Sequence, residues 1–152
     1  MKKLILCFVL LPFFAVSQES YTTLNGQKWD VNFDNAMRLA KKEHKNILLY
    51  FTGSDWCGPC KILKKDLFDT QEFADAATTF VLVYIDIPRS VDILTEKQLA
   101  QNKNLLRTHN KKGVFPLLKV LNAKGKTIDE LSGYSMNGEV QYHLNLLTKH
   151  SK

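Results

Sequence analysis

Two continuous hydrophobic runs stand out in the middle of the chain, and helical patterns surround them. The runs cover residues 46–52 and 80–87, the usual length of a strand. Runs without polar interruption fit strands that are buried on both faces, as in a parallel sheet. The residues between them favour a helix over roughly 57–68 and a shorter helix near 72–77. Together these segments predict a β-α-β unit with a right-handed crossover.

The flanking segments extend this unit into a larger sheet. Phe33, Ala36, Met37 and Ala40 are spaced for one face of a helix, which predicts an amphipathic helix over 32–44. Residues 18–28 are polar and turn-rich, so we expect a loose lead-in there. The other expected elements are a helix from the Thr95/Gln98 capping box to about 107, strands at 117–121 and 127–131, and a helix over about 140–147. The fold class is therefore α/β, with a central four-stranded mixed sheet and helices on both faces.

The composition fits one globular domain, preceded by a leader. The chain has 152 residues, of which 45% are hydrophobic and 24% are charged. Lys2 and Lys3 precede an apolar run over 4–14, and small residues follow up to Ser17. This layout predicts a secretory signal peptide over 1–17 and a domain over 18–152, outside the cytoplasm. Cys7 lies within the apolar run and has no small-residue box before it, so we expect no lipid attachment there.

Charge gives little reason to expect a nucleic-acid partner. The formal net charge is +6, and it becomes +4 when Lys2 and Lys3 leave with the leader. The remaining lysines are dispersed and lack interleaved aromatic residues, so a solvated surface explains them better than a nucleic-acid site. We expect a monomer.

The cysteines carry the clearest chemical signal. After loss of Cys7 the chain keeps only Cys57 and Cys60. A disulfide between such near neighbours closes a tiny loop and adds little stability, so the pair suggests chemistry. Cys57 falls at the start of the expected helix, where free N–H groups favour a thiolate. We therefore expect Cys57 to be the exposed nucleophile and Cys60 the buried thiol that resolves a mixed disulfide.

The residues around this pair resemble the active site of the thioredoxin superfamily. The segment Trp56-Cys-Gly-Pro-Cys-Lys61 matches the family's motif residue by residue, and it follows an expected strand. Phe115-Pro116 matches the position of the family's cis-proline, and Gly133 matches the glycine near that proline. The wider segment is similar to secreted bacterial thioredoxin-like proteins, which are related to the C-terminal domain of transmembrane disulfide reductases.

The resemblance implies a thioredoxin-like fold and a thiol–disulfide oxidoreductase acting on protein disulfides. It assigns Cys57 and Cys60 as catalytic residues, Trp56 as a lid over the disulfide, and Phe115 and Pro116 as substrate-binding residues with a cis bond between them. No metal and no organic cofactor are expected, because the cysteines carry the electrons. The implied direction is reducing, in the periplasm, with a membrane protein as electron donor.

The chain also departs from the family pattern. Tyr50 or Phe51 stands where the family has a buried Asp, and Asp55 and Asp86 are the candidate proton acceptors for Cys60. A missing acid predicts a potential less reducing than the value of about −270 mV given for thioredoxin, and Asp at position 51 should restore it. The segment from Asp86 to Pro116 is about twice the family length, so residues 88–112 form an insertion.

Three other interpretations compete with catalysis. The Cys-x-x-Cys pair could be half of a zinc site, although the chain's histidines lack ligand spacing. It could also be an inert structural disulfide. A non-enzymatic peptide-binding or chaperone-like module on the same fold is the alternative function.

Overall fold

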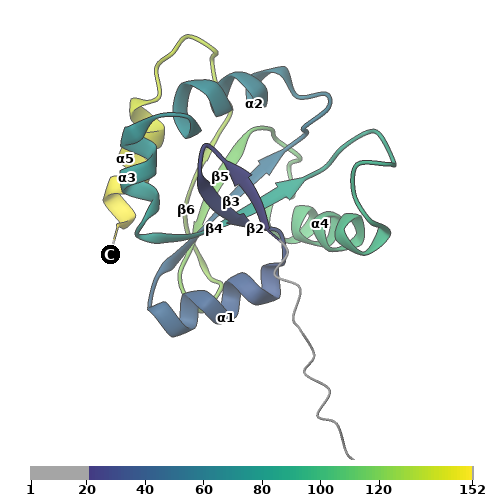
Figure 1. Ribbon diagram of the computed structural model, residues 1–152, viewed down its shortest axis with the longest axis horizontal. Helices are drawn as coiled ribbons and strands as arrows, with labels where there is room; N and C mark the ends of the chain where they lie inside the picture. Colours follow the sequence, from purple (N-terminus) through teal and green to yellow (C-terminus); the bar gives the residue numbers. More distant parts are fainter. Residues whose placement is uncertain (1–20, 152) are drawn as a thin grey trace, which may run out of the picture.

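The structure is a computed structural model that describes residues 21–151 (Figure 1). The expected signal peptide over 1–17, including Cys7, lies outside the described residues. Within the described part, no helix has the length and apolar character needed to cross a membrane.

One mixed sheet with the strand order β1-β2-β4-β3-β5-β6 forms the centre of the fold. β3 (Asn46–Thr52) pairs in parallel with β4 (Phe80–Asp86) and antiparallel with β5 (Leu117–Leu121). β6 (Thr127–Ser132) pairs antiparallel with β5 at one edge. These are the four strands that the hydrophobic pattern predicts. Because β3 lies between two partners, its end is surrounded by the ends of neighbouring strands.

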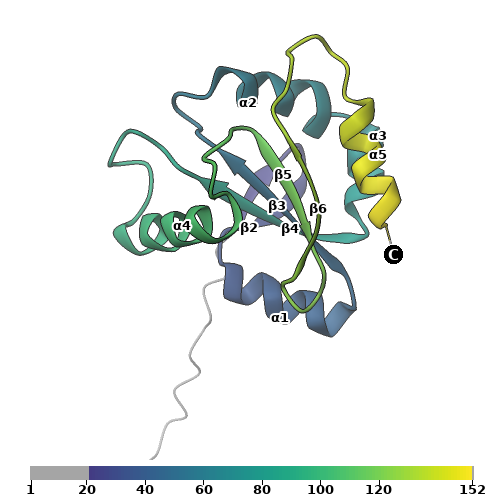
Figure 2. The ribbon, with the colours of Figure 1, turned by 180° about the vertical axis from the view of Figure 1, so that it is seen from behind.

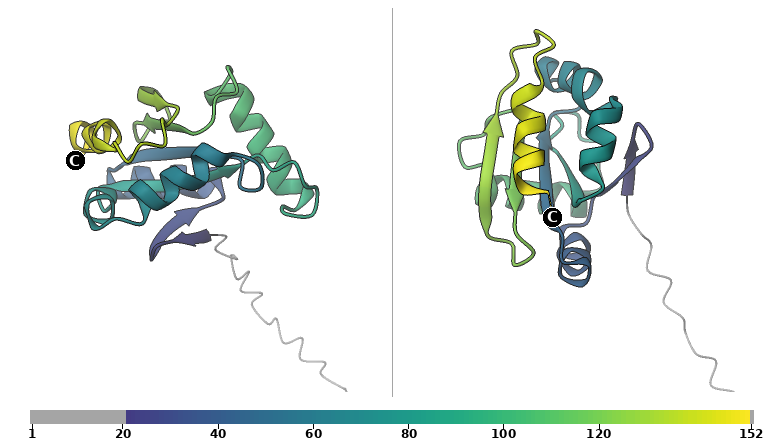
Figure 3. Two further views of the ribbon diagram at one scale, coloured as in Figure 1. Left: turned by 90° about the horizontal axis from the view of Figure 1, so that it is seen from above. Right: turned by 90° about the vertical axis from the view of Figure 1, so that its left-hand side faces the viewer.

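The expectation of a four-stranded sheet and a loose lead-in is wrong at the other edge. β1 (Tyr21–Leu24) and β2 (Gln27–Asp30) form a hairpin that brings the sheet to six strands. Asn25 and Gly26 both have positive φ, as a two-residue hairpin turn requires, and Asn-Gly is the sequence favoured there. Figure 3 shows this purple hairpin at the edge of the sheet opposite β6.

Helices cover both faces of the sheet, as the sequence predicts (Figures 1 and 2). The elements are α1 (Phe33–Glu43), α2 (Gly58–Leu63), a π-helical turn η1 (Lys64–Phe68), α3 (Gln71–Ala77), α4 (Glu96–His109) and α5 (Gln141–His150). Buried residues of α1 and α4 share one core cluster with Ile47, Leu49 and Phe51 of β3. Those of α2, η1, α3 and α5 share the other with Leu48 and Tyr50.

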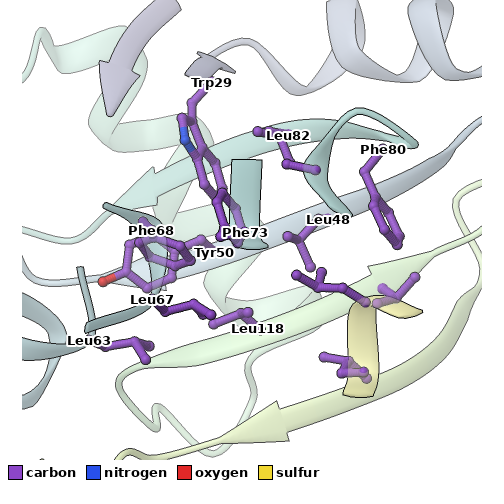
Figure 4. Close-up of a cluster of buried hydrophobic side chains, with 14 of the residues drawn as sticks. Trp29, Leu48, Tyr50, Leu63, Leu67, Phe68, Phe73, Phe80, Leu82 and Leu118 are labelled. Carbon is purple, nitrogen blue, oxygen red and sulfur yellow. The ribbon is translucent and has the colours of Figure 1, made fainter. Parts of the chain in front are cut away.

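Trp29 of β2 ties the hairpin into this second cluster. Its side chain is fully buried, and its ring centroid lies 5.2 Å from that of Phe68 and 6.0 Å from that of Phe73. Figure 4 shows Trp29 reaching toward Tyr50, Phe68 and Phe73. The hairpin therefore contributes to the core that supports α2 and the cysteine pair.

Candidate active site

A tight turn after β3 places the cysteine pair at the beginning of α2. The backbone N–H of Cys57 donates to the Gly53 carbonyl at 2.8 Å. On the other side of the turn, the Asp86 carboxylate accepts a hydrogen bond of 2.8 Å from the Ser54 N–H. Cys57 is the N-cap residue of α2, and its Sγ accepts from the Cys60 N–H at 3.3 Å. A sulfur in this position faces the free N–H groups of the helix, which favours a thiolate.

The two cysteines form a disulfide, with their Cα atoms 5.3 Å apart. Cys60 is 1% exposed, in agreement with its expected burial. The expectation that Cys57 is exposed is wrong, since only 3% of its surface is accessible. Both cysteines belong to the core cluster on the α2 face, and Trp56 and Phe115 pack against that cluster. These two aromatic residues thus lie next to the cluster in which Cys57 is buried.

Trp56 is half-buried and held from three sides. Its Nε1 donates to the Ile87 carbonyl at 2.8 Å. The Phe115 ring meets it edge-on with centroids 5.2 Å apart, and the Arg89 guanidinium lies 4.9 Å from its ring centroid. A Cβ on Gly53 would lie 2.2 Å from the indole, so only glycine leaves room for the ring. Sequence analysis missed Gly53 and Arg89, although the glycine before the motif was a possible signal.

The expected cis bond between Phe115 and Pro116 is confirmed. Leu117, the next residue, pairs with Phe51 at the end of β3. The Gly133 N–H donates to the Pro116 carbonyl at 2.8 Å, which confirms that this glycine lies beside the proline. Phe115 is also in ring contact with Trp56, the residue before Cys57. The structure thus brings Trp56, Cys57, Cys60, Phe115 and Pro116 into one region.

The structure decides which residue of β3 faces the cysteines. Tyr50 is buried in the same cluster as Cys57 and Cys60, and its hydroxyl donates to the Cys60 carbonyl at 3.2 Å. Phe51 lies in the cluster on the opposite face. The expectation that Asp at position 51 would act on the cysteines is therefore wrong, because neighbouring strand residues point to opposite faces. Tyr50 is the residue that an acid would have to replace.

Tyr50 also lines a pocket of about 200 Å³ beside Cys60, together with Thr52, Tyr84 and Lys61. Burial raises the pKa of Tyr50 to about 12, against a smaller lowering by the Thr52 hydroxyl, and the Asp86 carboxylate raises it further. The hydroxyl is thus a hydrogen-bond donor at neutral pH and cannot act as a base there.

The two candidate proton acceptors for Cys60 are engaged elsewhere. The exposed Asp55 carboxylate accepts hydrogen bonds from the Arg89 and Ser90 N–H groups. The Ser90 N–H makes the largest contribution to holding the pKa of Asp55 below its usual value. Asp86 is buried, and the Ser54 N–H and hydroxyl both donate to it. Among the described residues 21–151, neither carboxylate forms a hydrogen bond with a cysteine.

Metal binding is one of the interpretations that compete with catalysis at the cysteine pair. Among the described residues, no three His, Cys, Asp or Glu side chains gather in a group that could hold a metal ion.

The lysines near the motif behave as surface groups. The Lys61 Nζ donates to the Asp55 carbonyl at 3.2 Å, and Lys64 pairs with Asp69 at 2.9 Å.

A disulfide at the start of a helix, next to a cis-proline loop, defines the class of thioredoxin-like thiol–disulfide oxidoreductases. The sequence matches the thioredoxin-like domain family over residues 33–147, and the chain belongs to that family. This confirms the resemblance found in the sequence.

Individual relatives agree with the family assignment. The chain is 30% identical over 116 residues to the disulfide bond reductase DsbH of Chlamydia pneumoniae, covering 76% of this chain and 68% of the relative. A solved structure of a DsbH oxidoreductase superposes with a TM-score of 0.68 at 28% identity, covering 80% of this chain and 83% of the other. The C-terminal domain of Neisseria meningitidis DsbD shares the fold, with a TM-score of 0.52 at 20% identity over 78% and 92% of the two chains.

Proposed function

We propose that this protein reduces disulfide bonds in other proteins outside the cytoplasm. The single observation that carries the proposal is the Cys57–Cys60 disulfide, with Cys57 at the start of α2 and the aromatic pair Trp56 and Phe115 packed beside it. The reducing direction is supported by Gly58-Pro59 between the cysteines, as in thioredoxin, whose potential is about −270 mV. The similarity to a relative named as a disulfide bond reductase supports the same direction.

The reaction consists of two exchange steps. The Cys57 thiolate attacks one sulfur of a substrate disulfide, which forms a mixed disulfide and releases the first substrate thiolate. The Cys60 thiolate then attacks Cys57 Sγ, which closes the Cys57–Cys60 disulfide and releases the second substrate thiolate. Two electrons pass to the substrate, and the protons of the two cysteine thiols balance those that the substrate thiolates take up.

The surrounding residues have distinct roles in this proposal. Trp56 and Phe115 pack against the cluster that buries Cys57, and in this proposal they border the path of an approaching substrate disulfide. In this proposal the backbone before Pro116 pairs with an extended substrate segment. The Tyr50 hydroxyl holds the Cys60 carbonyl and so fixes the first turn of α2.

The location and the electron donor complete the proposal. The predicted leader over 1–17 directs the chain to the periplasm, where disulfides persist. A reductase there needs a source of electrons, and we propose a membrane protein that reduces the Cys57–Cys60 disulfide after each cycle. No organic cofactor and no metal take part in the proposed exchange.

The test uses cysteine variants and a protein substrate. Cys60→Ser should accumulate mixed disulfides through Cys57, and Cys57→Ser should form none. Iodoacetamide should modify Cys57 faster than Cys60 in the reduced protein, since the helix start lowers its pKa below the free value of about 8.5. Faster modification of Cys60 would contradict the assigned roles.

A double variant separates this proposal from the peptide-binding alternative. Cys57→Ser with Cys60→Ser should lose all reduction of insulin disulfides, measured by the turbidity of the released chains. Two results together would instead support a binding module. The wild type would reduce no disulfide, and the double variant would suppress the aggregation of an unfolded protein as well as the wild type does.

A further inference from the structure

The loop between β4 and α4, residues 88–95, projects at the end of the sheet to which β3 and β4 point (Figure 1). It begins the segment 88–112 that the sequence predicts to be an insertion relative to the family. Val91 and Ile93 in this loop are 79% and 44% exposed. Single exposed apolar residues are common on protein surfaces, so their exposure alone carries no meaning. The position of these side chains relative to the active site depends on how the loop is attached.

The base of the loop is fixed to the active-site turn. The Asp55 carboxylate accepts hydrogen bonds from the N–H groups of Arg89, at 3.0 Å, and Ser90, at 2.9 Å. The Arg89 guanidinium covers the Trp56 ring, whose Nε1 donates to the Ile87 carbonyl. All of these contacts involve Asp55 or Trp56, the two residues directly before Cys57. The loop therefore has a fixed position next to the nucleophile.

The helix that follows the loop is fixed as well. α4 begins after Thr95, and the Asn102 side chain donates to the Asp86 carbonyl at the end of β4, at 2.9 Å. The Gln101 side chain donates to the Val31 carbonyl and accepts from the Phe33 N–H. Because both ends are held, the exposed apolar side chains are presented by a supported segment beside the site.

We propose that Val91 and Ile93 form a docking surface for the substrate: an extended polypeptide segment with an apolar side chain close to its disulfide-bonded cysteine. Resting on the proposed reductase function, this inference adds a substrate preference to it. A protein disulfide can reach Cys57 only if the chain on either side of it lies on the surrounding surface. Because the Arg89 guanidinium lies over the Trp56 ring, the 88–95 loop is part of the surface that borders the residues before Cys57. Covering the two exposed apolar side chains with an apolar partner is favourable, whereas a polar partner gains nothing there.

The test is a double-mutant cycle between the protein and its substrate. Two peptides are prepared, each with one cysteine in a disulfide with glutathione, and they differ only in a Leu or a Ser two residues from that cysteine. The reduced wild-type protein should reduce the Leu peptide about ten-fold faster, a factor that corresponds to about 1.4 kcal/mol. Val91→Ser with Ile93→Ser should bring this preference within about two-fold and leave the rate with the Ser peptide unchanged.

The matched control removes two exposed apolar side chains elsewhere. Leu39 on α1 and Ile128 on β6 are 36% and 40% exposed, and Leu39→Ser with Ile128→Ser should keep the full preference. An unchanged preference in the Val91/Ile93 variant, or no preference in the wild type, would overturn the docking surface and leave the reductase function intact. A wild type that reduces neither peptide would overturn both proposals.

Discussion

The two faces of the central sheet are both buried, yet they carry different kinds of side chain. The face toward α1 and α4 is mainly aliphatic: Phe51 is the aromatic residue of its buried cluster, which also holds Ile47 and Leu49 of β3 and Ala36 and Ala40 of α1. The face toward α2 carries the cysteine pair among aromatic residues. The alternation along β3 separates a purely structural face from one where the chemistry takes place. The comparison teaches that the face of the sheet to which a β3 side chain points determines whether that side chain lies near the cysteines.

The largest expected effect tests whether the aromatic face depends on the hairpin. Trp29→Ala should lower the free energy of unfolding by about 3–5 kcal/mol, because it removes a fully buried aromatic side chain. Leu105→Ala, on the opposite face, should cost about 2–5 kcal/mol. Urea unfolding followed by circular dichroism measures both. A cost below about 1 kcal/mol for Trp29→Ala would contradict the view that the hairpin is a full part of the aromatic core.

A smaller effect is expected where Gly53 meets the ring of Trp56. Gly53→Ala should lower the free energy of unfolding by about 1–3 kcal/mol, because the ring must move away from the added Cβ. Gly58→Ala is the matched control, since a Cβ at Gly58 meets no atom within 4 Å. The fluorescence of Trp56, measured in a Trp29→Phe background, should change with the first substitution only. Identical spectra for both variants would show that the ring does not depend on Gly53.

Much of this architecture can be predicted from the sequence, because long hydrophobic runs and helical spacing are strong signals. β3, β4 and the cis-proline follow from such patterns and from the family resemblance. The β1–β2 hairpin was missed because four-residue strands have too little periodicity, although Asn25-Gly26 is a recognised turn signal. The sequence also could not show whether Tyr50 or Phe51 faces the cysteines. An uninterrupted apolar run shows that both faces are buried but not which face holds the cysteines.

The redox consequence of that choice is the next prediction. Tyr50→Asp should place a negative charge on the cysteine face, which disfavours the Cys57 thiolate and so raises the Cys57 pKa. A less stable reduced form means a lower potential, by about 30 mV for about 1.4 kcal/mol. The wild type should accordingly be somewhat less reducing than about −270 mV. Equilibration with glutathione measures the potential, and alkylation rates against pH measure the pKa.

Tyr50→Phe is the control for this substitution. It removes the hydrogen bond to the Cys60 carbonyl without adding a charge. If Tyr50→Phe shifts the potential as far as Tyr50→Asp does, the charge is not the cause. A wild-type potential at or below that of thioredoxin, with no change on substitution, would contradict the electrostatic account altogether.

The last prediction concerns the pH dependence of stability. Burial raises the pKa of Tyr50 from 10.0 to about 12, so the folded state favours the neutral phenol. Its contribution to stability should be complete below pH 10 and should be lost as the pH rises from 10 to about 12. The difference in absorbance at 295 nm between wild type and Tyr50→Phe reports this titration. A midpoint near pH 10 in the folded protein would contradict the burial of the hydroxyl.

The position of β3 between β4 and β5 also determines when the active site comes into existence during folding. The cysteines and β4 are close in sequence, but Phe115 and Pro116 arrive only when β5 pairs with β3, from residues about seventy positions further along. Contacts between such distant segments carry a larger loop-closure cost and form late. A folding chain would therefore contain both thiols before Phe115 and Pro116 have taken their places beside them. Folding of the C-terminal part of the chain is thus the step that completes the active site around the cysteine pair.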